Sequence, residues 1–158
     1  MHSLHNNHVK LMALALVEAK KAGQKKEVPI GAVVVDSEGN VTAAAYNQVI
    51  TRADVTAHAE ILAMRLACAT AKNYRLPGTT LFVTVEPCPM CMGAIIHARV
   101  ERLVFGAFDP KWGAAGSLYN FAADDRFNHQ PEVIPGVCEE ACRRLMQEFF
   151  RAKRVKYL

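Results

Sequence analysis

Two short segments of this chain combine the residue types that bind transition metals. "PCPMC" places Cys88 and Cys91 three residues apart, and "HAE" places His58 two residues before Glu60. Residues three apart in a helical turn share a face, so both thiols can bind one ion. Zinc prefers Cys and His, and a catalytic site supplies three protein ligands and leaves the fourth position to water. The pattern therefore favours a hydrolytic zinc site formed by His58, Cys88 and Cys91.

Glu60 is expected to carry protons rather than to bind the metal. A carboxylate beside thiolates and an activated water holds its proton more tightly than a carboxylate in bulk solvent. Both segments are predicted to begin a helix, and the positive end of the helix dipole favours the thiolate form that a metal ligand requires. The site can then exchange a proton near neutral pH.

A Cys-x-x-Cys pair is also typical of structural zinc sites and of redox couples. A structural zinc needs a fourth protein ligand, and the candidates are His97, Cys68, Cys138, Cys142 and His129. None of them repeats a zinc-knuckle spacing. A redox couple leaves the "HAE" segment without a role. Burial as small apolar side chains is the simpler interpretation of Cys68, Cys138 and Cys142.

Composition sets the limits within which this site must work. The chain has 158 residues, of which 51% are hydrophobic and 22% charged, which indicates one domain with its own core and excludes a disordered chain. The net charge of +4 is compatible with a polyanionic partner without requiring one. The apolar run 11–17 is too short to span a bilayer, so we expect a cytoplasmic protein whose five cysteines form no disulfides.

The apolar pattern predicts one mixed sheet with helices on both faces, in a single α/β domain covering residues 1–158. A first helix is expected from Asn6 or Asn7 to near Gly23, with Val9, Met12, Ala13 and Leu16 on its buried face. Further helices are predicted over 56–72, capped by Thr56, over 88–100 and over 139–153. Strands are predicted over 33–35, 41–46, 79–87, 102–108 and 132–136, and a loop over 109–130.

The predicted last helix carries both an apolar stripe and a basic face. Leu145, Phe149 and Ala152 form the stripe, which predicts packing against the core. The basic residues are Arg143, Arg144, Arg151, Lys153, Arg154 and Lys156. Besides forming a solvated face, these side chains are candidates for contacts with nucleic-acid phosphates.

The two motifs together resemble the signature of the zinc-dependent cytidine deaminase superfamily, H-x-E followed by P-C-x-x-C. The similarity extends over residues 28–151 and includes "EVPIGAVVV", "DVTAHAE" and "TVEPCPMCMGAIIHARV". Within the superfamily, "VFGAFDPKWGAAGSL" is similar to the branch that deaminates adenosine in tRNA. Phe108 departs from that pattern, because a basic residue is expected at its position.

The resemblance implies a three-layer α/β/α fold with a mixed, mostly five-stranded sheet, and one Zn²⁺ per subunit of a homodimer. It implies that His58, Cys88 and Cys91 bind the zinc and that Glu60 shuttles protons. It also implies a set of substrate-binding residues, which are Asn47, Asp109, Ala59, Pro87, Phe149 and Arg151. Of these, Asn47 would read the base edge and Asp109 would contact a ribose, although the residues alone also suit a turn and an exposed loop acid.

The activity implied by the resemblance is hydrolysis of adenosine to inosine at the wobble position of a tRNA anticodon, with an arginine tRNA as the expected substrate. A guanine or cytosine deaminase acting on a free base would use the same zinc chemistry, but it would not need the 109–118 loop or the basic tail. A non-enzymatic zinc module would make Glu60 dispensable and would leave the metal no open position.

Overall fold

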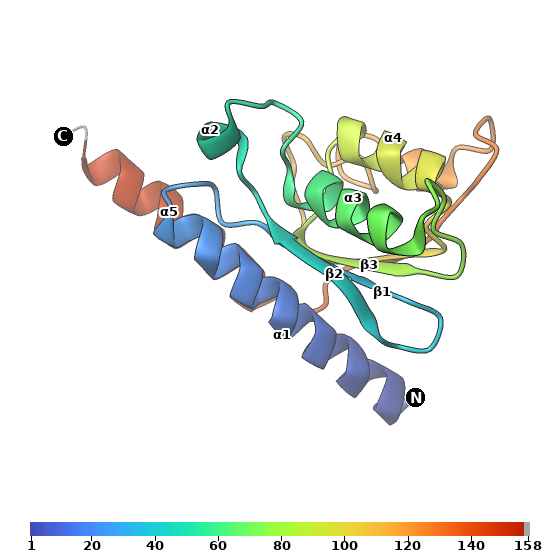
Figure 1. Cartoon of the computed structure of the whole chain (residues 1–158). Coiled ribbons are helices and arrows are strands. Elements are labelled where there is room, and N and C mark those ends of the chain that lie inside the picture. The colour runs from blue at the N-terminus through green and yellow to red at the C-terminus, as the bar shows by residue number, and fades with distance from the viewer. Residues whose placement is uncertain (157–158) are drawn as a thin grey trace.

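The computed structural model describes residues 1–156, in which five strands form one mixed sheet between two layers of helices (Figure 1). The strands are β1 (Gly31–Val35), β2 (Val41–Tyr46), β3 (Thr80–Val85), β4 (Arg102–Ala107) and β5 (Glu132–Ile134). Their spatial order is β2-β1-β3-β4-β5. β1 is antiparallel to both of its neighbours, and β3, β4 and β5 are parallel. The predicted mixed α/β sheet is therefore confirmed.

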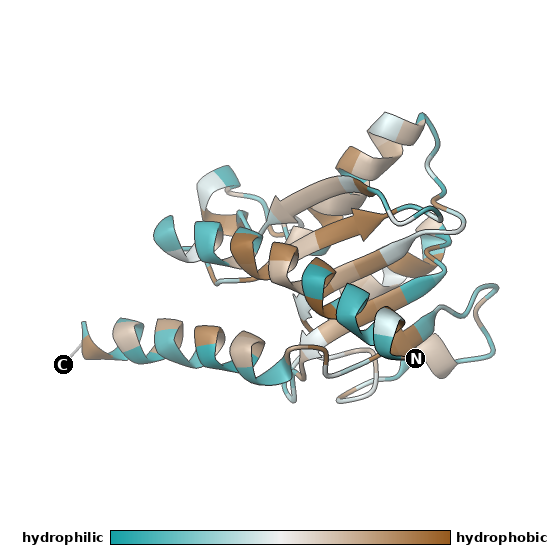
Figure 2. Ribbon diagram, turned by 90° about the horizontal axis from the view of Figure 1, so that it is seen from below, coloured by the Kyte–Doolittle hydropathy of each residue, from teal (hydrophilic) through white to brown (hydrophobic). Residues whose placement is uncertain are grey.

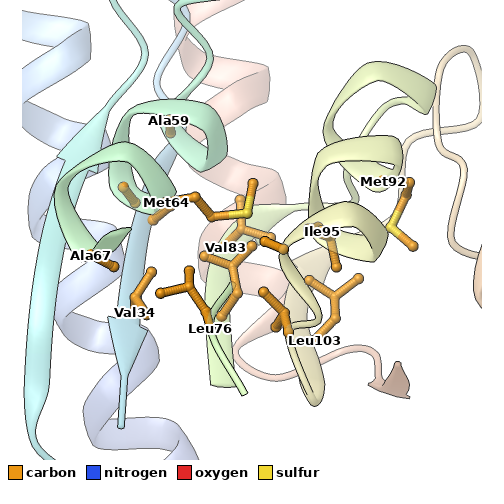
Figure 3. Packing of buried hydrophobic residues seen from close by; sticks show 14 of the residues in the cluster. Val34, Ala59, Met64, Ala67, Leu76, Val83, Met92, Ile95 and Leu103 are labelled. Carbon is orange, nitrogen blue, oxygen red and sulfur yellow. The ribbon is translucent and has the colours of Figure 1, made fainter. Parts of the chain in front are cut away.

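Each face of the sheet is covered by two helices, as Figure 1 shows. α3 (Ala59–Ala71) and α4 (Pro89–Ala98) lie on one face, and α1 (His2–Gln24) and α5 (Glu139–Val155) lie on the other. Side chains alternate along the strands, so Val34, Val83 and Leu103 pack towards α3 and α4 (Figure 3). Their neighbours Phe82 and Val104 belong to the second core, beneath α1 and α5.

α1 differs from its prediction at its start and on its buried face. The helix begins at His2 rather than at Asn6 or Asn7, and the buried residues are Leu11, Met12, Ala15, Ala19 and Ala22. Val9 and Ala13, which were predicted to be buried, are exposed. The small alanines face the sheet because the backbone of Gly31 lies so close that a Cβ there would overlap the carbonyl oxygen of Ala15.

α5 packs against the sheet only through its first turns. Cys142 is its one buried residue among those described, Phe149 is half-buried and Ala152 is exposed. The second half of the helix projects past the sheet (Figure 2). The prediction that the whole apolar stripe packs against the core is therefore wrong, because the sheet ends before the helix does.

Strand direction gathers the ends of three strands at one edge of the sheet. β2 and β3 are each antiparallel to β1, and β4 is parallel to β3, so all three run the same way. Val85 at the end of β3 pairs with Ala107 at the end of β4. The segments that follow these strands are therefore neighbours, and they contain Asn47, Cys88 and Asp109. Ligand sites form at such carboxyl edges in open α/β sheets. Between residues 1 and 156 no helix is both long and apolar enough to cross a bilayer.

Two smaller elements complete the chain. α2 (Val49–Arg52) is a single helical turn after β2, and η1 (Phe121–Ala123) is a short 3-10 helix within the predicted 109–130 loop. Neither was predicted from the sequence. The predicted fifth strand is confirmed as β5.

Candidate metal centre

His58, Cys88 and Cys91 converge at the carboxyl edge of the sheet. The Nδ1 atom of His58 lies 3.7 Å from the Cys88 Sγ and 3.5 Å from the Cys91 Sγ. All three potential ligand atoms lie within 4.8 Å of one another. A tetrahedral zinc with ordinary Zn–S and Zn–N bonds separates its nitrogen and sulfur ligands by about 3.6 Å. The three side chains are thus already arranged to fit a zinc ion.

Within residues 1–156, no other group of three or more metal-binding side chains comes together. The five candidates for a fourth protein ligand have other environments. Cys68 contacts the Tyr74 carbonyl oxygen at 3.6 Å, and His129 Nε2 lies 2.6 Å from the Val100 carbonyl oxygen. Cys142 is buried under the opposite face of the sheet, and Cys138 packs beside that same core. His97 is exposed in the last turn of α4. A three-ligand site, with one position left for water, is what the chain offers.

The metal ligands lie at the starts of two helices. His58 and Cys88 are the N-cap residues of α3 and α4, and Cys91 lies in the first turn of α4, where Pro89 favours helix initiation. The prediction that Thr56 caps α3 is wrong. Its hydroxyl and its backbone N–H both donate to the Asp54 carboxylate, at 2.7 and 2.8 Å, so the helix starts after His58 instead.

In the metal-free site the pKa values of the two thiols are shifted in opposite directions. The hydrogen bond from Cys91 lowers the pKa of Cys88 to about 4, and the same pairing raises the pKa of Cys91. Hydrogen bonding to Cys88 also raises the pKa of His58. The protein therefore stabilises a thiolate at Cys88, which is the form a zinc ligand requires.

Glu60 is buried in the first turn of α3, with 3% of its surface exposed. Burial raises the pKa of its carboxyl, while the nearby His58 charge acts in the opposite direction. Asn47 is also buried. Its Nδ2 donates to the Val28 carbonyl oxygen at 3.2 Å, but its Oδ1 accepts no hydrogen bond from the described residues. The Oδ1 atom of Asn47 thus keeps a hydrogen-bond acceptor that the described residues do not use.

The other predicted substrate residues divide between this edge and α5. Ala59 and Pro87 are buried directly beside the ligands, and the Pro87 carbonyl oxygen accepts from Ala114 N at 2.8 Å. Asp109 Oδ1 accepts from the backbone N–H groups of Lys111 and Trp112 at 3.0 and 3.3 Å. Phe149 and Arg151 are not brought into this cluster, because they lie in the projecting half of α5.

Phe108 and Trp112 flank Asp109 and present aromatic surface to solvent. Phe108 is 46% exposed and packs edge-on against Phe105, with ring centroids 5.2 Å apart. Trp112 is 65% exposed. The sequence left open whether Phe108 packs or offers a stacking surface, and its geometry allows both.

Two buried carboxylates near this edge were missed by the sequence analysis. Glu27 accepts from Ile50 N, Thr51 N and the Thr51 hydroxyl at 3.0, 2.7 and 2.7 Å, and so holds the start of α2. Glu86 accepts hydrogen bonds from the 109–117 loop. For Glu86 the one available signal was its place between a buried strand and the Pro-Cys motif.

A cavity beside α3 and α4 does not include the metal ligands. It has a volume of about 590 Å³, and its lining comes mainly from the outer sides of α3 and α4, including Met64, Cys68, Ala94 and His97. Because none of the ligands lines this cavity, the convergence of side chains rather than the cavity identifies the functional centre.

Comparison with known proteins agrees with this centre. Residues 5–107 match the cytidine and deoxycytidylate deaminase zinc-binding region family. The chain is 52% identical to the tRNA-specific adenosine deaminase of Bacillus subtilis, over 92% of this chain and 89% of that protein. It is 48% identical to the tRNA-specific adenosine deaminase of Haemophilus influenzae, over 92% and 84% of the two chains.

Solved structures give the same relationship. A structure from a study of A-to-I editing by tRNA:A34 deaminases superposes with a TM-score of 0.83 at 47% identity, covering 86% of this chain and 98% of that one. The guanine deaminase of Nitrosomonas europaea superposes with a TM-score of 0.78 at 26% identity, covering 89% and 83%. With its zinc site at His58, Cys88 and Cys91, the chain belongs to the tRNA-specific adenosine deaminases, within the cytidine and deoxycytidylate deaminase zinc-binding family.

Proposed function

We propose that this protein hydrolyses adenosine to inosine at the wobble position of a tRNA anticodon, with an arginine tRNA as its substrate. The reaction consumes one water and releases ammonia from C6 of the purine. The observation that carries the proposal is the three-ligand centre with the buried Glu60 beside it, in a chain that shares about half its residues with tRNA-specific adenosine deaminases. A wobble base is partly unstacked already, so extruding it into a pocket costs less than in a duplex.

His58, Cys88 and Cys91 would hold the zinc, which when bound makes water a nucleophile at neutral pH. Both ligand-bearing helices direct their N-termini at the site. Their dipoles favour negative charge there, which supports the thiolates and the developing anion alike. Glu60 takes one proton from the attacking water and passes it to ring nitrogen N1, and then takes the second from the hydroxyl formed at C6 and passes it to the amino group, which leaves as ammonia.

Asn47 is proposed to recognise the edge of the flipped base. Its Oδ1 is buried without a hydrogen-bond partner among the described residues, and an unmet buried acceptor is costly unless a substrate group satisfies it. The Nδ2 bond to Val28 fixes the orientation of the amide. Ala59 and Pro87, beside the ligands, would line the same pocket.

Asp109 is proposed to contact the ribose of the flipped nucleotide. Its Oδ1 already accepts two backbone N–H groups, which fix the carboxylate at the loop start. No hydrogen bond from residues 1–156 ends on its Oδ2, which leaves that oxygen to accept a ribose hydroxyl.

The projecting half of α5 is proposed to bind the anticodon arm through Phe149 and Arg151. Two arginines in the first half are engaged, because Arg143 pairs with Glu139 and Glu140, and Arg144 pairs with Glu140. Arg151 forms no ion pair with the described residues. Phe149 lies under the Lys153 ammonium at 6.0 Å. Unpaired cations beside an aromatic ring suit phosphates and exposed bases.

The protein is further proposed to act as a homodimer of single-domain subunits in the cytoplasm. The outer side of α3 and α4 supports the dimer, since it combines the cavity with the exposed side chains of Tyr74 and Met90. A reducing compartment suits five free cysteines. Light scattering of the purified protein would test the dimer.

The test of the activity is a direct comparison of substrates. The zinc-loaded protein is incubated with an anticodon stem-loop carrying a wobble adenosine, and separately with free guanine, cytosine and adenosine, while inosine and ammonia are measured. Inosine from the stem-loop alone is expected. A stem-loop with its adenosine moved away from the wobble position controls for position, and Glu60→Gln protein controls for contaminating activity. Turnover of a free base with an untouched stem-loop would assign the protein to nucleobase metabolism instead.

A further inference from the structure

The Glu86 carboxylate is the centre of a hydrogen-bond cluster that the reaction itself does not use. Oε1 accepts from Asp109 N at 3.1 Å and from the Ser117 hydroxyl. Oε2 accepts from Ala115 N at 3.1 Å and from Ser117 N at 3.0 Å. One side chain thus joins both ends of the 109–117 loop.

The loop is shaped to fit this carboxylate. Gly113 lies so close that a Cβ there would overlap the Glu86 carboxyl group. The Gly113 carbonyl oxygen in turn accepts from Leu118 N and Tyr119 N, at 2.8 and 3.1 Å. The chain therefore wraps around Glu86 and closes behind it.

The negative charge of Glu86 has no cationic partner in the part of the chain that the structure describes. No lysine or arginine within residues 1–156 forms an ion pair with it, and only 3% of its surface is exposed. Its charge is balanced by the N–H and O–H groups of the loop alone. A carboxylate is needed because all four donors require acceptors, and an amide would offer one acceptor oxygen and one donor nitrogen.

The same short segment also leads into the metal site. Glu86 N donates to the Ala107 carbonyl oxygen at 2.8 Å, and the next carbonyl, that of Pro87, accepts from Ala114 N. Cys88 follows directly. Three consecutive residues, from Glu86 to Cys88, therefore connect the loop that carries Asp109 to a zinc ligand.

We infer that Glu86 is a positioning residue, whose carboxylate holds the 109–117 loop against the metal centre and so sets the affinity for the RNA substrate. The inference rests on the proposed function, in which this loop contacts the nucleotide beside the flipped base. Without the carboxylate the loop loses its shape while the zinc ligands, which are held by α3 and α4, stay in place. Glu86 touches neither metal nor substrate and acts only through the loop.

The test compares Glu86→Gln with the wild-type protein, both loaded with zinc. On the wobble-adenosine stem-loop we expect KM to rise about tenfold or more, since several charge-assisted hydrogen bonds are lost at once. Zinc content should stay at one ion per chain. A variant that merely unfolds in part would lower the apparent kcat and leave KM unchanged, because KM reports on the folded molecules.

Met12→Ala is the matched control for stability. Met12 is buried under the opposite face of the sheet, so its truncation destabilises the fold without touching the loop. It should leave KM unchanged. If Glu86→Gln fails to fold, Ser117→Ala replaces it. That variant keeps the carboxylate and removes one donor, so a KM rise of about threefold to tenfold is expected.

Hydrogen exchange provides a readout that does not depend on activity. In Glu86→Gln, amides in the 109–118 segment should exchange faster, while those at the starts of α3 and α4 keep their wild-type rates. Unchanged KM, or unchanged exchange in the loop, would overturn the inference, and so would loss of zinc. A wild-type protein inactive on the stem-loop would refute the proposed function instead, and exchange would still decide whether Glu86 holds the loop.

Discussion

Glu60 and Glu86 are equally buried, each with 3% of its surface exposed, yet their surroundings differ completely. Glu86, at the end of β3, accepts four hydrogen bonds from one loop. Glu60, at the start of α3, accepts none from the backbone N–H of any other described residue, and burial raises its pKa. A carboxylate fixed by four hydrogen bonds to one loop maintains structure, whereas a buried carboxylate with a raised pKa beside the metal ligands is suited to proton transfer.

Removing the metal should distinguish the roles of Glu60 and Glu86 most clearly. Chelation is expected to reduce inosine formation to background, because the nucleophile is lost, while the exchange rates of the 109–118 amides remain low. Inosine assays and hydrogen exchange on the same sample measure both. Adding Zn²⁺ back should restore activity. Faster exchange of the 109–118 amides after chelation would contradict a purely structural role of Glu86, because it would show that the Glu86 hydrogen bonds depend on the metal.

Glu60→Gln should cause the next largest loss. We expect kcat to fall about a thousandfold, within the range that general acid–base catalysis contributes, with zinc retained and stem-loop binding unchanged. Single-turnover assays give the rate, and fluorescence anisotropy with a labelled stem-loop gives the affinity. Full activity in this variant would show that Glu60 carries no proton, and loss of zinc would show that it supports the ligands.

The strands and the metal ligands were predictable because their signals are local. A run such as "LFVTV" is apolar on both faces, and His58, Cys88 and Cys91 lie within two short motifs. The roles assigned to Asn47 and Asp109 came from family resemblance, since Asn and Asp are also common in turns. The sequence pattern does not show that Oδ1 of Asn47 is buried without a hydrogen-bond partner among the described residues, and only the fold reveals it.

The features that escaped prediction depend on partners distant in sequence. α2 is held by Glu27, more than twenty residues before it, and Glu86 is satisfied by donors 23 to 31 residues after it. No periodicity marks such pairs. The cap of α3 was misassigned for a related reason, because Asp54 competes for the Thr56 hydroxyl. Local rules cannot decide between two partners for one group.

Glu27 is a second buried carboxylate that, like Glu86, accepts hydrogen bonds from a neighbouring segment. It is fully buried and accepts from the start of α2. Burial alone would raise its pKa, but hydrogen bonds from Thr51 and Ile50 lower it below 4.5. Because the folded pKa is depressed, its stabilisation is present above pH 4.5 and is lost as pH falls through the folded pKa.

Glu27→Gln should therefore lower the free energy of unfolding by about 1–3 kcal/mol at pH 7, and the difference from wild type should shrink below pH 4.5. Urea denaturation of metal-free protein at both pH values measures this and keeps zinc release out of the comparison. Glu148→Gln, on the exposed side of α5, is the control and should change little. A difference that grows on acidification would contradict the assignment.

A distinction between paired and unpaired side chains applies to the cations of α5 and predicts the smallest effect. Arg143 is paired with Glu139 and Glu140, whereas Arg151 forms no ion pair with residues 1–156. Arg151→Ala should weaken stem-loop binding several-fold at low salt and reduce the slope of log K against log salt by roughly 0.7 to 0.9, the value for one phosphate contact. Arg143→Ala should leave that slope unchanged, because its charge is already neutralised within the helix. Equal slopes for the two variants would mean that pairing within α5 does not determine which of its arginines meets RNA.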